Sequence, residues 1–161
     1  MPPPSILTGT DNPILRQVSE EVDITTTDLP ALKKTLLCAL SNDKNGVGLA
    51  APQIGILKRA ILVTLREKDI LFMANPVITS FSAETEIDEE GCLSVPGEFG
   101  KVARAAHVTV EYYDEHGKKQ KKNLSHFEAR IVQHEIDHLN GILFVDRLMH
   151  ETPLFEGKSV F

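Results

Sequence analysis

The sequence has no tryptophan, only two cysteines and no long hydrophobic run. A transmembrane helix needs about 20 consecutive apolar residues, and the sequence has no such stretch. The first residues, Met-Pro-Pro-Pro-Ser, lack the basic and apolar regions of a secretory signal. We therefore expect an intracellular protein, cytoplasmic unless an organellar transit peptide was removed upstream, in which a disulfide is not expected.

Positive charge is scarce as well. The 17 lysines and arginines face 23 acidic residues, for a formal net charge of −6. This balance predicts neither direct DNA binding nor binding to an anionic membrane. With 161 residues, 42% of them hydrophobic and 25% charged, the composition is that of one globular domain, which we expect to span residues 1–161.

An H-E-x-x-H motif stands near the C-terminal end, from His134 to His138. Histidines four residues apart project from one face of a helix, so both reach one metal ion. Glu135 is badly placed to be a third ligand on that face but well placed to take a proton from water bound to the metal. Residues 125–128 suggest a capping box and Gly141 suits the helix end, so we expect a largely buried helix. The alternative is a chance match, with two histidines that only form hydrogen bonds in the core.

The third ligand decides the chemistry, because catalytic zinc-type sites use three protein ligands and one open position. The extended H-E-x-x-H-x-x-G-x-x-H pattern fails here, since Phe144 stands where the third histidine belongs. Glu151 and Glu156 are downstream carboxylate candidates. Cys92, in the stretch 90–97, offers a thiolate that together with two imidazoles suits zinc or ferrous iron. This stretch is too interrupted for an ordinary core strand, and on the residues alone Cys92 as a core residue stays open.

The remaining periodicity predicts an α+β fold with antiparallel sheets. Asp11-Asn12-Pro13 indicates a helix to about Glu21, and a second, amphipathic helix is expected over residues 29–41, with Cys38 as a small core residue. The short β-prone runs are expected at residues 59–65, 70–73, 77–81, 83–87 and 108–113. Four lysines within residues 118–122 favour a charged edge strand over an RNA contact. The H-E-x-x-H helix is expected to pack centrally on the sheets.

Three stretches together resemble the peptide deformylase family. They are Gly-Val-Gly-Leu-Ala-Ala-Pro-Gln at 46–53, Glu-Gly-Cys-Leu-Ser at 90–94 and Gln-His-Glu-Ile-Asp-His at 133–138. Their order and spacing match that family over nearly the whole chain. The resemblance implies a hydrolase that removes the formyl group from the N-formylmethionine of newly made polypeptides and releases formate.

The resemblance also implies residue roles. One divalent metal ion, Fe²⁺ in the native state with Zn²⁺, Ni²⁺ or Co²⁺ as substitutes, would have three ligands: Cys92, His134 and His138. Glu135 would be the general base that passes the proton to the leaving amine. The side-chain amide of Gln53 and the backbone N–H of Leu93 would stabilise the oxyanion. Glu90 and Arg104 match a family ion pair that braces the cysteine loop, although they could equally be unrelated surface charges.

Substrate contacts are implied in the same way. Gly46 and Gly48 would let the peptide add alongside as an extra strand. The candidates for the methionine pocket are apolar: Val47, Phe127 and Ile131. The alternative for these three is core packing. The loop 96–100 is a variant of the family's loop, and the short tail 154–161 lacks the basic helix through which some members contact the ribosome, so we do not carry that contact over.

Two other classes stay open on the sequence. A zinc endopeptidase would need a glutamate as third ligand and would leave Cys92 dispensable. A structural metal domain or inactive binder would close all four coordination positions with protein and leave Glu135 replaceable.

Overall fold

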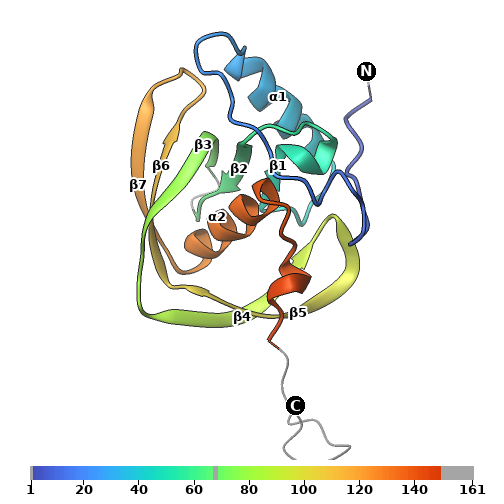
Figure 1. The fold of residues 1–161 in the computed structure, drawn as a ribbon, viewed down its shortest axis with the longest axis vertical. Coiled ribbons are helices and arrows are strands. Elements are labelled where there is room, and N and C mark those ends of the chain that lie inside the picture. The colour runs from blue at the N-terminus through green and yellow to red at the C-terminus, as the bar shows by residue number, and fades with distance from the viewer. Residues whose placement is uncertain (1, 67–68, 150–161) are drawn as a thin grey trace, which may run out of the picture.

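The computed structural model describes residues 2–66 and 69–149. The elements in these ranges, shown in Figure 1, are α1 (Leu29–Leu40), β1 (Gly48–Ala50), η1 (Ala51–Ile54), β2 (Ala60–Thr64), β3 (Ile70–Phe81), β4 (Thr85–Cys92), β5 (Val95–Ala105), β6 (His107–Tyr113), β7 (Lys119–Ser125), α2 (His126–Leu139) and η2 (Phe144–Arg147). The paired strands are antiparallel. The predicted α+β class is confirmed.

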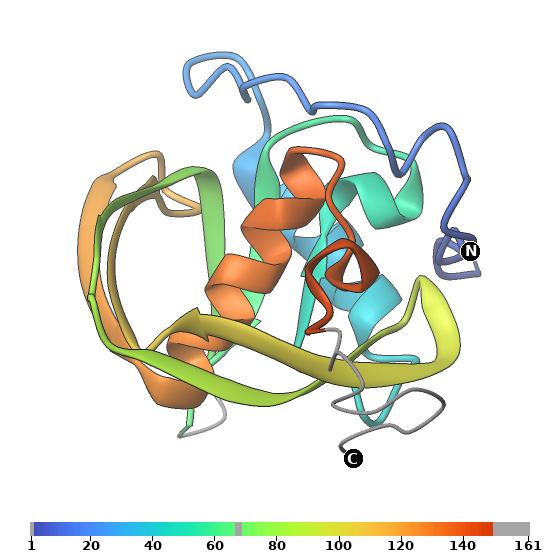
Figure 2. The same ribbon diagram turned by 60° about the horizontal axis from the view of Figure 1, so that its bottom comes forward.

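Two sheets surround α2. One has five strands in the order β1-β2-β3-β6-β7, and the other is the two-stranded hairpin β4-β5. Figure 1 shows α2 between them, with the hairpin below the helix, and in Figure 2 the hairpin crosses in front of the helix. Apolar side chains of α2, such as Ile131 and Val132, pack with Ile61, Val63 and Val110 of the larger sheet. This burial holds α2 in place, because removing apolar surface from water is the main stabilising term in folding.

The polar residues of α2 are also largely buried. Five of them are buried: Arg130, Gln133, Glu135, Asp137 and His138. A buried polar group is costly unless it is hydrogen-bonded or bound to an ion. The buried polar side chains of α2 are therefore candidates for a functional site.

The second predicted helix is confirmed as α1. The carboxylate of Asp28 accepts a hydrogen bond from the backbone N–H of Ala31 at 3.0 Å, and Pro30 stands in the first turn. Leu36 is fully buried against the larger sheet. Cys38, predicted to be a core residue, is exposed, because it lies two residues beyond Leu36 and faces away from the sheet.

The helix predicted from Asp11 to about Glu21 is wrong, and this part of the chain consists of turns. The side chain of Asn12 accepts a hydrogen bond from the backbone N–H of Ile14 at 3.0 Å, which favours a local turn over a helix. Beyond it, the backbone N–H of Ser19 donates to the carbonyl of Leu139 at 2.8 Å. The N-terminal segment thus uses its polar groups to bind the end of α2.

Two predicted strands, 70–73 and 77–81, join into the single strand β3. Its pairing with β6 shifts register between Ala74 and Val77, where the φ of Asn75 is 51°, and again between Ile78 and Ser80. The run 83–87 extends to Cys92 in β4, and the missed strand β5 pairs with it. The stretch 90–97, predicted to be too interrupted for a strand, is the closed end of this hairpin, where Cys92 pairs with Val95.

The lysine-rich segment is confirmed as the edge strand β7, which pairs with β6. The start of α2 is correct, but the capping box is wrong. Ser125 is the N-cap residue, yet its hydroxyl lies 2.8 Å from Nδ1 of His107, and Glu128 accepts a hydrogen bond from the backbone N–H of Arg66 at 2.6 Å. Neither helix in the described ranges is long and apolar enough to cross a membrane.

Candidate metal centre

The hairpin and α2 bring together three side chains that could hold a metal ion. Cys92 ends β4, while His134 and His138 lie one turn apart on α2. Their ligand atoms lie within 4.8 Å of one another, and Sγ of Cys92 is 3.3 Å from Nε2 of His138. The three residues that the resemblance implied as ligands are thus neighbours in the fold.

The two imidazoles differ in their surroundings. His138 is 1% exposed, its Nδ1 has no hydrogen-bond partner among the described residues, and burial lowers its pKa well below the usual value. It is therefore neutral, with a lone pair available. Burial also opposes protonation of His134, but hydrogen bonds to Cys92 and Glu90 outweigh it and raise the pKa of His134 to about 10. A cation between the thiolate and the imidazoles would take the place of that proton.

This donor set fits a divalent transition metal. One thiolate and two imidazoles are ligands that zinc and ferrous iron accept. In the residues that the structure describes, three such donors converge, which matches a catalytic site with one open position. Glu151 and Glu156, the downstream candidates for a third ligand, lie outside the described residues.

Glu135 lies beside these candidate ligands, and its carboxylate is buried. It is 4% exposed, and its Oε1 has no hydrogen-bond partner in the described residues. Burial is the main cause that raises the pKa of Glu135 to about 7. A carboxyl group poised near neutrality can take up and release a proton during a reaction.

Gln53 is fixed on the other side of Cys92. Its Oε1 accepts a hydrogen bond from the backbone N–H of Ala50 at 2.9 Å, and its Nε2 donates to the hydroxyl of Ser94 at 3.0 Å. The same Nε2 lies 3.7 Å from Sγ of Cys92. Ser94, which sequence reasoning missed, is fully buried and orients the amide of Gln53. Leu93 lines the same cavity as Gln53 and Cys92.

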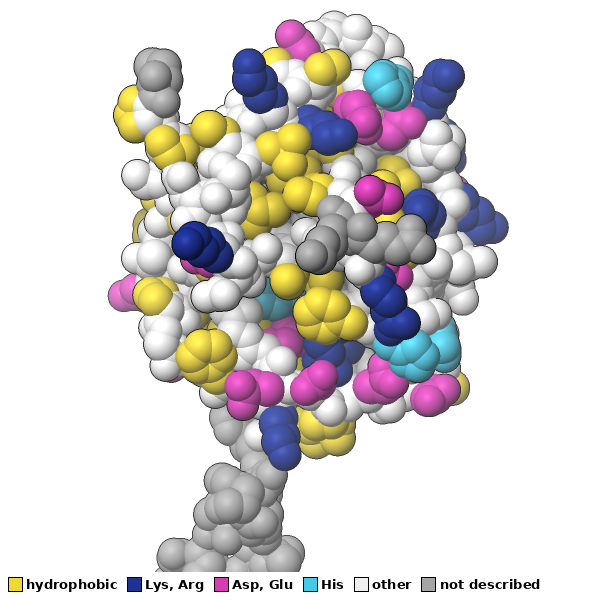
Figure 3. Space-filling view, turned by 180° about the vertical axis from the view of Figure 1, so that it is seen from behind, with side chains coloured by type: hydrophobic (Ala, Val, Ile, Leu, Met, Phe, Trp, Pro, Cys, Tyr) yellow, Lys and Arg dark blue, Asp and Glu magenta, His cyan; other side chains and the backbone are white. Residues whose placement is uncertain are grey.

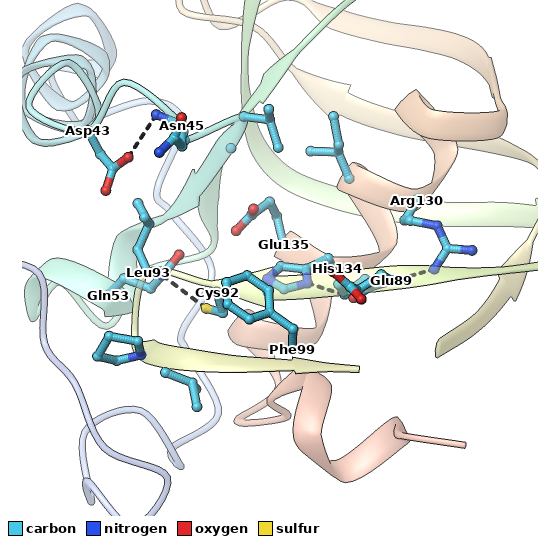
Figure 4. Close-up of a pocket in the computed structure, with 18 of the residues that line it drawn as sticks. Asp43, Asn45, Gln53, Glu89, Cys92, Leu93, Phe99, Arg130, His134 and Glu135 are labelled. Atoms are coloured by element: carbon cyan, nitrogen blue, oxygen red, sulfur yellow. Dashed lines mark hydrogen bonds and ion pairs between the residues drawn. The ribbon is translucent and has the colours of Figure 1, made fainter. Parts of the chain in front are cut away.

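A cavity of about 570 Å³ opens in front of these groups. In the close-up, Cys92, His134 and Glu135 point into it (Figure 4). The space-filling view shows a hollow on this face between exposed hydrophobic side chains (Figure 3). All five residues proposed for substrate binding line it: Gly46, Val47, Gly48, Phe127 and Ile131.

The cavity also has lining residues that sequence reasoning missed, among them Asp43, Asn45 and Phe99. Phe99 lies across the hairpin from Gly91, where a Cβ atom would be 2.6 Å from its ring. The pairing of a glycine with an aromatic residue is a signal for this contact, but it can be used only once β5 is recognised as a strand.

Behind the ligands lies a buried network of charges. Arg104 donates to both carboxylate oxygens of Glu90 at 2.9 Å and to Asp137 at 2.6 Å, and His134 donates from Nδ1 to Glu90 at 2.9 Å. Burial alone would raise the pKa of Glu90, but hydrogen bonds from Arg104 and His134 outweigh it and hold the pKa well below the usual value. Glu90 is therefore an anion that orients His134.

The ion pair of Glu90 and Arg104 is thus present, and the network includes two members that sequence reasoning missed, Arg130 and Asp137. The signal for both in the sequence was their position relative to the H-E-x-x-H motif. Arg130 lies one turn before His134, and Asp137 lies within the H-E-x-x-H motif. Ionised side chains on a helix expected to be buried need partners of opposite charge.

Comparison with known proteins agrees with this geometry. Residues 4–153 match the family described as polypeptide deformylase. The peptide deformylase of Desulforudis audaxviator is 45% identical over 148 residues, covering 92% of this chain and 94% of the relative. That of Synechocystis is 40% identical over 162 residues, covering 98% and 85%.

Solved structures are similar as well. A class I type b peptide deformylase from Acinetobacter baumannii superposes with a TM-score of 0.85 at 40% identity, covering 92% of this chain and 99% of that one. A peptide deformylase from Synechococcus elongatus in complex with actinonin has a TM-score of 0.86 at 37% identity, covering 93% and 81%.

Proposed function

Since the chain belongs to the polypeptide deformylase family, it is a metal-dependent hydrolase that removes the formyl group from N-terminal formylmethionine, and we propose which of its residues perform this reaction. The proposed metal ligands are Cys92, His134 and His138. The observation that carries the proposal is their convergence within 4.8 Å beside the buried carboxylate of Glu135, whose Oε1 has no hydrogen-bond partner in the described residues. We propose Fe²⁺ as the native ion and Zn²⁺, Ni²⁺ or Co²⁺ as substitutes, because each accepts thiolate and imidazole ligands.

When bound, the ion supplies a Lewis acid that polarises the formyl carbonyl and lowers the pKa of water. Glu135 takes a proton from the attacking water, whose oxygen bonds to the formyl carbon. As the carbon–nitrogen bond breaks, Glu135 passes the proton to the leaving amine, which gives formate and a free amino terminus. Its pKa of about 7 suits both steps.

The oxyanion that forms on the formyl group needs hydrogen-bond donors already in place. We propose the side-chain amide of Gln53 and the backbone N–H of Leu93. The bonds of Gln53 to Ala50 and Ser94 support this role, because they hold the amide beside Cys92 without rearrangement.

The peptide is proposed to bind along β1. This strand is at the edge of the five-stranded sheet, so an extended peptide can add to it, and Gly46 and Gly48 leave room for its backbone. Val47, Phe127 and Ile131 would receive the methionine side chain. Val47 and Phe127 are 40% and 52% exposed, and a bound methionine would remove this apolar surface from water.

We also propose that residues 1–161 act as one catalytic domain, which the family match over residues 4–153 supports. Its partners are the formylmethionyl ends of nascent polypeptides. The tail 154–161 lies outside the described residues, and the proposal includes no contact of that tail with the ribosome.

The test is formate release from a short N-formylmethionyl peptide, with protein prepared without oxygen and supplied with Fe²⁺ or Ni²⁺. We expect rapid release by wild type and little release by the Cys92→Ala variant. Full formate release by Cys92→Ala would show that the Cys92 thiolate is not a metal ligand. Cleavage of internal peptide bonds, with no formate released, would favour an endopeptidase.

A further inference from the structure

The proposed ligands come from two separate elements. Cys92 ends β4 in the hairpin, whereas both histidines belong to α2. The hairpin crosses α2 as a two-stranded sheet of its own (Figure 2). The distance from the thiolate to the imidazoles therefore depends on how firmly the hairpin is held against the helix.

Arg130 makes this connection directly. Its Nη1 donates to Oε2 of Glu90 at 2.7 Å and to the carbonyl of Val102 at 2.8 Å, and its Nη2 donates to the carbonyl of Glu86 at 2.7 Å. Glu86 and Glu90 belong to β4 and Val102 to β5, so one guanidinium ties both strands of the hairpin to α2. The side chain is 7% exposed, which makes these bonds costly to lose.

We propose that Arg130 is a positioning residue for the metal centre: by tying both strands to α2, it sets the position of the Cys92 thiolate relative to His134 and His138. This inference rests on the proposed ligand set. Gln133 provides a separate tie, since its amide bonds to the backbone N–H and carbonyl of Ala105 at 3.1 and 2.9 Å. Because this tie and the bonds of Arg104 remain, a protein without the Arg130 guanidinium is expected to fold.

Geometry and charge predict opposite effects of removing Arg130 on the affinity for the metal ion. In this network the carboxylates of Glu90 and Asp137 face the buried guanidiniums of Arg104 and Arg130 and the half-exposed one of Arg147. Arg130→Met removes one positive charge near the proposed ion, and Coulomb attraction to the remaining carboxylates alone would then tighten cation binding. Loss of the hairpin's position against α2 would weaken cation binding. The sign of the change therefore distinguishes the two effects.

Arg147 provides a matched control. Its guanidinium bonds to Asp137 at 2.6 and 2.9 Å, so Arg147→Met also removes a positive charge from the network. Among the described residues, its polar side-chain contacts are with Asp137 and not with the hairpin. It is 45% exposed, so water and salt screen its charge more strongly.

The experiment is a Co²⁺ titration with a competing chelator, in which the thiolate-to-cobalt charge-transfer band reports whether Cys92 is bound. Metal-orienting partners typically contribute about 10–100-fold in affinity. We expect Arg130→Met to bind Co²⁺ about 10–100-fold more weakly with a diminished thiolate band, and Arg147→Met to stay within about twofold of wild type. Arg130→Lys, which keeps the charge without the forked geometry, should fall between wild type and Arg130→Met.

Other outcomes overturn the inference. Arg130→Met that binds Co²⁺ as tightly as wild type, or more tightly, with an unchanged thiolate band would show that charge outweighs position. If neither Arg130 variant folds without metal, as judged by circular dichroism, the residue determines the fold and not the position of the thiolate. A wild-type protein that lacks the thiolate band would instead overturn the proposed ligand set.

Discussion

At the scale of single residues, Gly48 shows how closely β1 approaches the reacting groups. A Cβ atom there would lie 2.6 Å from Oε2 of Glu135 and 2.9 Å from the carbonyl of Leu62. The carbonyl belongs to a paired strand and cannot yield, so Gly48→Ala should displace Glu135. A displacement of about 1 Å at a reacting group can cost about 100-fold. We expect kcat/KM for formate release to fall by about 10–100-fold with the metal retained.

Gly46→Ala is the control for this substitution. Its added Cβ would meet Cδ1 of Leu40 at 2.7 Å, which is the far end of a flexible side chain that can move aside. Because Gly46 is also proposed to lie beside the peptide, KM is expected to rise, but kcat should fall much less than for Gly48→Ala. An equal loss of kcat in both variants would mean that the segment tolerates no side chain and that displacement of Glu135 is not the cause.

Glu135→Gln tests the general base without a change in size. Glutamine cannot accept the proton, so we expect turnover to fall by at least about 100-fold, while metal content, measured by elemental analysis, stays at the wild-type level. A variant that keeps full turnover would assign proton transfer to another group.

Arg104→Ala tests the buried network. It would leave Glu90 and Asp137 without a principal partner, and removal of one member of a buried ion pair typically costs about 3–5 kcal/mol. We expect that loss in the free energy of unfolding, measured with urea, together with poorer metal retention. The exposed pair of Lys58 and Glu20 is the comparison, since Lys58→Ala should cost about 1 kcal/mol or less. If Arg104→Ala keeps its activity and its full metal content, Arg104 does not hold the cysteine loop in place.

At the scale of elements, the turn between β6 and β7 depends on Asp114. Its carboxylate accepts hydrogen bonds from the backbone N–H groups of His116 and Lys118 and from the side chain of Gln120. Desolvation would raise the pKa of Asp114, but these bonds outweigh it and lower the pKa below its usual value. The stabilisation is therefore fully present above the ordinary pKa of about 4 and is lost as the pH falls through the lowered value.

Asp114→Ala should accordingly destabilise the protein by about 1 kcal/mol at pH 7. Urea unfolding at a series of pH values is the measurement, and the difference from wild type should shrink as the pH falls below about 4. A constant difference across that range would show that the ionised carboxylate is not what stabilises the turn.

The elements that could be predicted are those whose signals are local. The H-E-x-x-H helix has apolar periodicity, a start at Ser125 and a glycine with φ of 73° at its end, Gly141. The hairpin partner β5 could not be found in this way, because Pro96, Gly97 and the exposed charges that follow do not alternate. Pairing with β4 makes this segment a strand, and that pairing is a tertiary effect.

The same distinction applies to the site. The two histidine ligands follow from the H-E-x-x-H spacing and Cys92 from the family resemblance, whereas the contacts of Arg130 and Ser94 depend on where the hairpin lies against α2 and η1. The helix predicted at Asp11 failed for a related reason. Asp11 and Pro13 are local signals typical of a helix start, but the backbone there bonds to the end of α2 and the Asn12 side chain forms a turn.

At the scale of the whole molecule, the proposed metal ion would link the two sheets through α2. Cys92 closes the small sheet and the histidines lie on the helix packed against the large one, so an ion bound to all three opposes their separation on unfolding. A ligand that binds only the native state stabilises it by about 2.7 kcal/mol at 100 times its Kd. For a chain of this size, each kcal/mol raises Tm by about 2–4 °C.

Metal loading should therefore raise Tm by about 5–11 °C over chelator-treated protein, measured by calorimetry without oxygen. The control is His138→Ala, which keeps the bonds of Arg130 and Gln133 to the hairpin but lacks one proposed ligand, and its Tm should respond little to metal. If wild type and His138→Ala shift equally, the ion binds elsewhere. If wild type binds metal with no change in Tm, the folded and unfolded chains bind it equally well, and the three side chains do not form a site that requires the fold.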